Sequence, residues 1–242
     1  GSTIPINHRC LVAEDTTALF TCMSKTAVLS YCGSYHFALS GKPDRNAMAE
    51  ALQSLSLFRG TGSGIGSGYE LEKTPTRAEA LIMLIRMLGE EKAALACTAS
   101  QPFIDVPDWC VPYVAYAYER GYSNGVGTDN LGHSYFGTQQ TASAVMYVEF
   151  MLRALGYSST ATTNISDALD RAVTAGVLTA GERTALQSSD FLRADVAYLS
   201  YYALSARTSG GAALSRKLID AGVFTDADYR AAQALVKTAR IA

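Results

Sequence analysis

The sequence predicts a mainly α-helical protein, in which three similar helix-loop-helix units follow a short N-terminal segment of different composition. Two observations predict this fold class. Apolar residues recur every three or four positions from Arg45 onward, which is the period of a helix buried on one side. A similar helix also occurs at three places along the chain, so we expect the units to pack on one another around a shared core.

The first 44 residues differ from the rest of the chain. Residues 17–24, 26–32 and 35–40 are short runs rich in Thr, Val, Leu, Phe and Tyr, and they predict short β-strands. Three interpretations of residues 1–44 stay open: the end of a preceding domain, a strand-forming cap on the helical part, or a separate ligand-binding element.

Eight helices are predicted after this segment. Their expected ranges are 45–57, 75–88, 109–120, 140–155, 166–175, 191–206, 213–221 and 226–239. Several are followed by glycine, as at Gly121, Gly176 and Gly222, because the residue past a helix often takes a left-handed conformation. We place the three units at about residues 45–97, 103–158 and 163–225, with a closing helix over 226–239.

One helix is present in three copies. The first begins Thr76-Arg77-Ala78-Glu79 and ends Arg86-Met87-Leu88-Gly89, and the third begins Leu192-Arg193-Ala194-Asp195. The middle copy ends Arg153-Ala154-Leu155-Gly156, and with Thr141 aligned to Thr76 it has Ala142 in the place of Arg77.

The composition excludes several classes of function. The 20 basic and 22 acidic residues give a net charge of −2 with no long block of one sign, which argues against a nucleic-acid partner. The apolar fraction of 48% indicates an ordered globular chain. The sequence contains no long uncharged apolar run, so we expect no insertion into a membrane. Gly1-Ser2 resembles a cloning remnant, so the lack of an export signal carries no information.

No catalytic motif is evident. The glycine-rich stretch at residues 60–68 has neither the G-x-G-x-x-G spacing nor a following Gly-Lys-Ser/Thr, and it predicts a flexible loop. The histidines His8, His36 and His133 are scattered, and the Cys32 to His36 segment lacks evident partners for thiol catalysis. We expect no enzymatic activity, no cofactor and no metal site.

Strings in the first and second units carry a family resemblance. The second unit contains Phe103-Ile104-Asp105-Val106-Pro107-Asp108-Trp109, then Gly121-Tyr122-Ser123-Asn124-Gly125, then Phe136-Gly137. With the helix start Thr76-Arg77-Ala78-Glu79, these strings resemble the S-layer homology (SLH) module, which has an F-x-D-V and Trp stretch, a G-x-x-x-G turn and a T-R-A-E helix start. The resemblance covers about residues 45–225.

The resemblance implies a fold, a ligand and a location. Three SLH modules form a pseudo-three-fold helical bundle, and the grooves between modules bind a secondary cell-wall polysaccharide, usually through pyruvylated amino sugars. The implied function is non-covalent anchoring outside the cell, at the cell wall or S-layer of a Gram-positive-type bacterium. The implied polysaccharide-binding residues are Arg77, Arg193, Asp105, Trp109, Asn124, Gly125, Gly60 and Glu79.

The residue chemistry allows this function and also structural alternatives. Arg77 lies in the first turn of a helix, beside N–H groups without intrahelical partners, and both features favour a carboxylate ligand. For Arg77 and Arg193 the alternative is an ion pair within a module, for example with Asp105. Asp105 is more simply an acceptor that ties down its loop, and Trp109 offers a face for a sugar ring or a core side chain.

The remaining candidates have similar alternatives. Thr76 and Glu79 have the spacing of a capping box, and the turns at Gly60 and Gly125 allow close approach of the backbone to a ligand. The third unit lacks an evident F-x-D-V and Trp stretch and the first lacks the Trp. The expected site is therefore the groove that combines Asp105 and Trp109 with one of the two arginines.

A protein-binding function is the alternative hypothesis. An exported SLH trio can act as an adhesin that binds another surface or host protein, with residues 1–44 as its distinctive part. Export also places the five cysteines in an oxidising compartment. Cys97 and Cys110 flank the loop before the second unit and are a candidate disulfide, while Cys10, Cys22 and Cys32 leave one thiol over.

Overall fold

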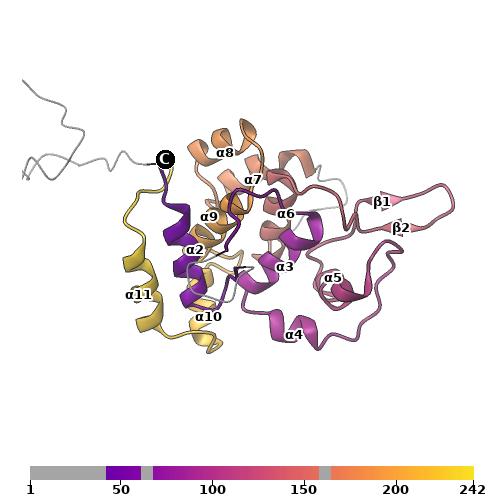
Figure 1. The fold of residues 1–242 in the computed structure, drawn as a ribbon, viewed down its shortest axis with the longest axis horizontal. Coiled ribbons are helices and arrows are strands. Elements are labelled where there is room, and N and C mark those ends of the chain that lie inside the picture. Colours follow the sequence, from indigo (N-terminus) through magenta and orange to yellow (C-terminus); the bar gives the residue numbers. More distant parts are fainter. Residues whose placement is uncertain (1–41, 61–67, 158–164) are drawn as a thin grey trace, which may run out of the picture. The chain divides into compact units, whose positions relative to one another are not determined.

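The structure, a computed structural model, describes residues 42–60, 68–157 and 165–242 (Figure 1). The strands predicted in the N-terminal segment, most of the predicted glycine-rich loop, and Cys10, Cys22 and Cys32 lie outside these ranges. The described residues belong to one compact unit and are mainly helical, so the prediction of a mainly α-helical fold is confirmed.

All eight predicted helices are present, and each is shorter than expected. They are α2 (Arg45–Ser54), α3 (Arg77–Met87), α5 (Val111–Glu119), α6 (Ala144–Ala154), α7 (Ala168–Thr174), α9 (Arg193–Ala203), α10 (Leu214–Asp220) and α11 (Asp226–Leu235). Two 3₁₀ turns, η1 (Asp108–Cys110) and η2 (Ile165–Asp167), lead into α5 and α7. The helices are shorter because the predicted ranges include capping and turn residues that lie just outside the helical backbone.

Three further elements are not predicted by the sequence patterns. Two are the short helices α4 (Glu91–Leu95) and α8 (Ala180–Gln187). The third is an antiparallel hairpin of β1 (Gly127–Thr128) and β2 (Ser134–Tyr135), which projects away from the helices beside α5 and α6 (Figure 1). The hairpin precedes α6 and places its side chains outside the helical core.

Helices α3, α6 and α9 are the three copies of the repeated helix, and each has 11 residues. Their first residues are Arg77, Ala144 and Arg193. The alignment that paired Ala142 with Arg77 is therefore wrong by two residues, because Ser143 and not Thr141 is the N-cap of α6. Alanine still replaces arginine in the middle copy, so that part of the prediction is unchanged.

Each repeated helix packs against a helix from another part of the chain. Helix α5 packs on α3, α7 packs on α6, and α2 packs on α9 near the other end of the sequence. Helix α3 also contacts both α6 and α9. A pseudo-three-fold bundle requires this kind of closure, but the pseudo-three-fold arrangement and the division into modules stay predictions.

The core lies where these helices meet. Fully buried side chains include Leu81 and Leu84 of α3, Tyr147 and Leu152 of α6, and Val196 of α9. Burying a side chain of this size stabilises the fold by roughly 1.5–3 kcal/mol. None of the helices in the described ranges has the length and apolar character needed to cross a bilayer.

The segment after α11 returns across the helices. Helix α11 packs on α2, and the N–H of Asp44, just before α2, donates to Thr238 Oγ1 over 3.0 Å. Further on, Thr179 Oγ1 donates to the Ile241 carbonyl oxygen over 2.7 Å, and the Ile241 N–H donates to the Tyr198 hydroxyl over 3.0 Å. This segment therefore joins α2, α8 and α9.

Candidate functional site

Arg77 lies in the interior, at the first position of α3. Its side chain is 3% exposed, and its guanidinium stacks on the rings of Phe136 and Phe150 at 5.0 and 4.7 Å. It donates to Ser123 Oγ over 3.0 Å and to the Gly125 carbonyl oxygen over 3.3 Å. Arg77 makes no ion pair within the described ranges, so the predicted pair with Asp105 is not formed.

Burial has the largest effect on the pKa of the Arg77 guanidinium. Together with the nearby charge of Arg153, burial lowers the pKa of the guanidinium to about 10, and the Asp105 carboxylate opposes this change. The side chain remains charged at neutral pH. Its positive charge is stabilised by a hydroxyl, a carbonyl oxygen and two aromatic faces rather than by an acidic partner.

The N–H groups at the start of α3 bind the loop before α6. Arg77 N–H donates to the Gln140 carbonyl oxygen over 2.7 Å, and Ala78 N–H donates to the Thr138 carbonyl oxygen over 3.3 Å. These groups lack intrahelical partners, as expected at a helix start, but the loop already occupies them. An anion therefore finds no free N–H group at these two positions.

Glu79 completes the cap of the same helix. Its carboxylate accepts the Thr76 N–H over 2.7 Å, while Thr76 Oγ1 accepts the Glu79 N–H over 3.3 Å. This reciprocal pair is a capping box, so the predicted structural function of Thr76 and Glu79 is confirmed. Glu79 is exposed, and its predicted contact with polysaccharide stays a prediction.

Arg193 has the same kind of environment at the start of α9. It is 9% exposed, and its Nε donates to the Tyr69 carbonyl oxygen over 3.0 Å. The main-chain N–H of Arg193 donates to the Lys73 carbonyl oxygen over 2.8 Å. Burial lowers the pKa of the guanidinium, and the charge of Glu79 acts in the opposite direction. Both candidate arginines therefore donate to backbone carbonyl oxygens of loops. Arg77 contacts the loop after α5, and Arg193 contacts the loop before α3.

Asp105 is a structural acceptor. Its carboxylate accepts the N–H groups of Phe136 and Gly137, each over 2.7 Å, and that of Thr138 over 3.2 Å. In return, Thr138 Oγ1 donates to the Asp105 carbonyl oxygen over 2.7 Å. The carboxylate thus ties the loop after the hairpin to the segment before η1, as the structural alternative predicted.

The glycine and asparagine candidates differ from one another. Gly125 has a φ of +81°, and a Cβ there would clash with the Phe103 ring and the Tyr135 carbonyl oxygen. The backbone at Gly125 therefore approaches other parts of the protein closely. Asn124 is exposed, and Gly60 is half-buried at the end of the first described range. Their predicted ligand contacts stay predictions.

Trp109 lies in η1 and is 56% exposed. The alternative that Trp109 is a core side chain is therefore wrong. Its indole is available to a ligand, but Trp109 does not line the same hollow as Asp105. The structure brings Arg77, Asp105 and Gly125 into one region through contacts within the protein, and it places Trp109 outside that set.

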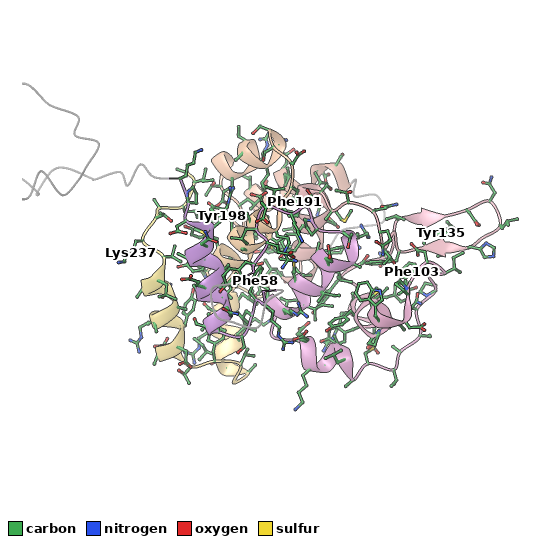
Figure 2. All side chains as sticks on the ribbon, viewed as in Figure 1. Phe58, Phe103, Tyr135, Phe191, Tyr198 and Lys237 are labelled. Carbon is green, nitrogen blue, oxygen red and sulfur yellow. The ribbon has the colours of Figure 1, made fainter. Side chains whose placement is uncertain are left out.

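A hollow of about 710 Å³ opens beside the hairpin, and we call it the hairpin hollow. It is lined by Asp105, residues 126–129, Tyr135 and residues 137–140. Figure 2 shows Tyr135 on the hairpin with Phe103 near its base. The volume lies within the range of roughly 300–1,000 Å³ that is usual for small-ligand sites.

Asp129 organises the turn at one side of this hollow. One carboxylate oxygen accepts the N–H groups of Leu131 and His133, and the other contacts His133 Nδ1 at 3.0 Å and accepts the Tyr135 hydroxyl over 3.1 Å. The hydrogen bond from the His133 N–H is the largest cause that lowers the pKa of this carboxyl. Asp129 is therefore a carboxylate at neutral pH.

Sequence patterns did not single out Thr128, Asp129, Tyr135, Gln139 or Gln140 as site residues. The signal that was present is the turn composition Asp129-Asn130-Leu131-Gly132, which is typical of a hairpin loop. Recognising that turn would have predicted the hairpin, but the hollow also depends on how the 137–140 loop folds over it. That arrangement is tertiary.

The predicted disulfide between Cys97 and Cys110 is not formed. Both thiols are free, with Cys97 half-buried and Cys110 buried. Burial, followed by the charge of Asp105, raises the pKa of the Cys110 thiol to about 11. Among the described residues, no three His, Cys, Asp or Glu side chains converge to hold a metal ion.

Comparison with known proteins finds a relative that matches part of the chain. The chain is 30% identical over 118 residues to a protein of Thermoanaerobacter kivui that is named "Cell surface protein". The matched region is 48% of this chain and 14% of that protein. The chain matches no known protein-family profile.

Proposed function

We propose that the protein is a non-catalytic surface protein that binds cell-wall polysaccharide without a covalent bond. A surface location is supported by the similarity to the T. kivui protein, whose name refers to the cell surface. The match spans only 14% of that relative, so the activity of the whole relative cannot be transferred to this chain. Attachment to a Gram-positive-type wall, at the wall or S-layer, is part of the proposal.

The observation that carries the carbohydrate-binding part is the hairpin hollow. It is wide open to solvent, and its lining combines amide, hydroxyl and carboxylate side chains with the ring of Tyr135. A small set of polar groups beside an apolar face is the usual composition of a small-ligand site. Trp109 of η1 is also exposed and provides a second aromatic surface, outside the hollow.

The buried arginines contribute less to this proposal than the sequence resemblance implies. A pyruvyl carboxylate would have to displace Arg77 from Ser123 and Gly125, or Arg193 from Tyr69. Leaving the buried Ser123 hydroxyl without this donor would alone cost roughly 1–3 kcal/mol. We therefore assign polysaccharide binding to exposed groups first.

A sedimentation assay tests the proposal. The intact chain is mixed with purified Gram-positive cell walls that retain their secondary polysaccharide and with walls from which that polysaccharide has been extracted. We expect the protein to sediment only with the first and to be released by soluble polysaccharide. Equal sedimentation with both preparations, or with neither, would contradict polysaccharide binding.

A protein-binding function is the second candidate, and one observation favours it. Of the seven large apolar side chains that are exposed in the described ranges, five lie between Ile104 and Leu131. Leu131, at the hairpin turn, is 81% exposed. These five side chains are close in sequence, and exposed apolar side chains that form one patch are typical of protein-binding surfaces.

One double variant separates the candidates. Replacing Leu131 and Ile104 together by Ser should abolish binding to a protein partner on a host or bacterial surface while leaving sedimentation with walls unchanged. A protein-binding function requires that loss. If the double variant binds cells as the parent chain does, and sedimentation with walls accounts for all binding, the second candidate is wrong.

A further inference from the structure

We propose that the hairpin hollow binds a neutral sugar unit of the wall polysaccharide through its hydroxyl and acetamido groups, and that it disfavours pyruvylated or otherwise anionic units. This inference rests on the proposed function and narrows it to one site and one class of ligand. The argument depends on the charge of the lining, on its unused hydrogen-bonding groups and on one aromatic ring.

The charge of the lining disfavours an anion. Its two charged side chains, Asp105 and Asp129, are both acidic, and none of the described lining residues is a lysine or arginine. Arg77 influences the same region, but its guanidinium is buried and already donates to Ser123 and Gly125. A carboxylate ligand would meet two like charges, whereas a neutral sugar would not.

The unused hydrogen-bonding groups suit a sugar. The side-chain amides of Gln139 and Gln140 are exposed and make no hydrogen bond within the described residues. Each amide provides two donors and one acceptor oxygen. Because hydroxyl and acetamido groups also combine donors and acceptors, they can pair with these amides without leaving a charge unpaired.

The two carboxylates differ in what they can still accept. A carboxylate has about four acceptor positions. Asp129 uses all of them on Leu131, His133 and Tyr135, whereas Asp105 accepts three N–H groups. Asp105 thus keeps one acceptor position, which a sugar hydroxyl can fill and a second carboxylate cannot.

Tyr135 provides the apolar face. Its hydroxyl donates to Asp129 over 3.1 Å, so the ring is held in one orientation beside the hollow. A sugar ring has an apolar face of its own, and a fixed aromatic ring can cover it at little cost in side-chain entropy. The site therefore combines a fixed ring with adaptable amides.

The test uses the intact chain labelled with ¹⁵N and a neutral probe, tri-N-acetylchitotriose. We expect its titration to shift the backbone amide signals of residues 126–129 and 137–140. Replacing Gln139 and Gln140 together by Ala should weaken the affinity by about tenfold or more, because two sets of hydrogen bonds are lost. The matched control is Gln233→Ala, an exposed glutamine on α11, which should leave the affinity unchanged.

A second measurement addresses the charge of the ligand. Wall polysaccharide fragments are compared before and after removal of their pyruvyl groups. We expect tighter binding after removal, because the repulsion by Asp105 and Asp129 is then relieved. Unchanged or weaker binding after removal of pyruvate, or chitotriose shifts confined to other residues, would overturn the inference.

Failure of this inference is distinguishable from failure of the proposed function. If the Gln139→Ala, Gln140→Ala double variant sediments with walls as well as the parent chain, the hollow is not the site, although anchoring stands. If the parent chain titrates with chitotriose at the hollow but does not sediment with walls, the ligand class stands and anchoring is wrong. Circular dichroism verifies that each variant is folded.

Discussion

The main-chain N–H of Arg77 donates to the carbonyl oxygen of Gln140 over 2.7 Å, so the start of α3 is closed by the loop that leads into α6. The start of α9 is closed in the same way, because Arg193 N–H donates to the Lys73 carbonyl oxygen over 2.8 Å. In both cases a loop distant in sequence satisfies a helix start. The side chains of both arginines are also buried at these helix starts, so their hydrogen bonds stabilise the fold.

Arg77→Ala should destabilise the protein. The change removes two hydrogen bonds and the contacts with Phe136 and Phe150, so we expect the free energy of unfolding to fall by about 2–4 kcal/mol. Urea denaturation measures the change. The control is Arg216→Ala, which removes an exposed, solvent-screened pair with Asp220 and should have a much smaller effect. Equal effects of the two substitutions would contradict the structural function of Arg77.

Gly125→Ala should be more damaging than Gly132→Ala. Both glycines have a positive φ, +81° and +88°, so both substitutions strain the backbone by about 1 kcal/mol. A Cβ at Gly125 would also clash with Phe103 and Tyr135, whereas nothing lies within 4 Å of a Cβ at Gly132. We expect a further loss of about 1–3 kcal/mol at Gly125, measured by thermal denaturation. Similar melting temperatures for the two variants would show that the hairpin base is not packed as described.

Cys110 should be unreactive in the folded protein. With a pKa of about 11, only about one thiol in a thousand is ionised at pH 8, and the thiolate is the reactive form. Alkylation at pH 8 followed by peptide mass spectrometry should label half-buried Cys97 faster than Cys110, and should label both quickly in urea. Non-reduced peptides should show no link between the two residues. A Cys97–Cys110 cross-linked peptide in freshly purified protein would contradict the structure.

Glu149 should make stability depend on acid pH. Its carboxyl is buried, which by itself raises the pKa, but hydrogen bonds from Arg171 and Arg153 outweigh burial and hold the pKa below the ordinary value of 4.5. A carboxyl whose pKa is lowered on folding contributes stability above its unfolded pKa and loses this contribution as the pH falls through the folded value. We therefore expect the stability contributed by Glu149 to be full at pH 7 and to decline below about pH 4.5.

The variant Glu149→Gln isolates this contribution. At pH 7 it leaves two arginines without their shared carboxylate, so we expect a loss of about 2–4 kcal/mol in the free energy of unfolding. Between pH 7 and pH 3 the difference between the parent chain and the variant should shrink, because the parent carboxyl becomes protonated. A difference that stays constant over this range, measured by urea denaturation, would show that another group controls the acid branch.

Much of the helical fold could be predicted because it depends on local patterns. The apolar period from Arg45 onward predicted helices that the structure contains, and Thr76 with Glu79 predicted a capping box that is formed. Helix α8 was also within reach, because Thr179 and Glu182 form the same kind of box. The sequence therefore carries a local signal for this helix too.

The candidate site was less predictable. The sequence alone determined that an arginine begins two of the three repeated helices, that Asp105 precedes the α5 helix and that glutamines follow Phe136. Only the tertiary structure decided that Arg77 is buried between Phe136 and Phe150, that Asp105 binds three N–H groups and that Gln139 and Gln140 face a hollow. The physical reason is that helix formation and capping depend on residues three or four apart, whereas the availability of a charge to a ligand depends on which distant loop has already bound it.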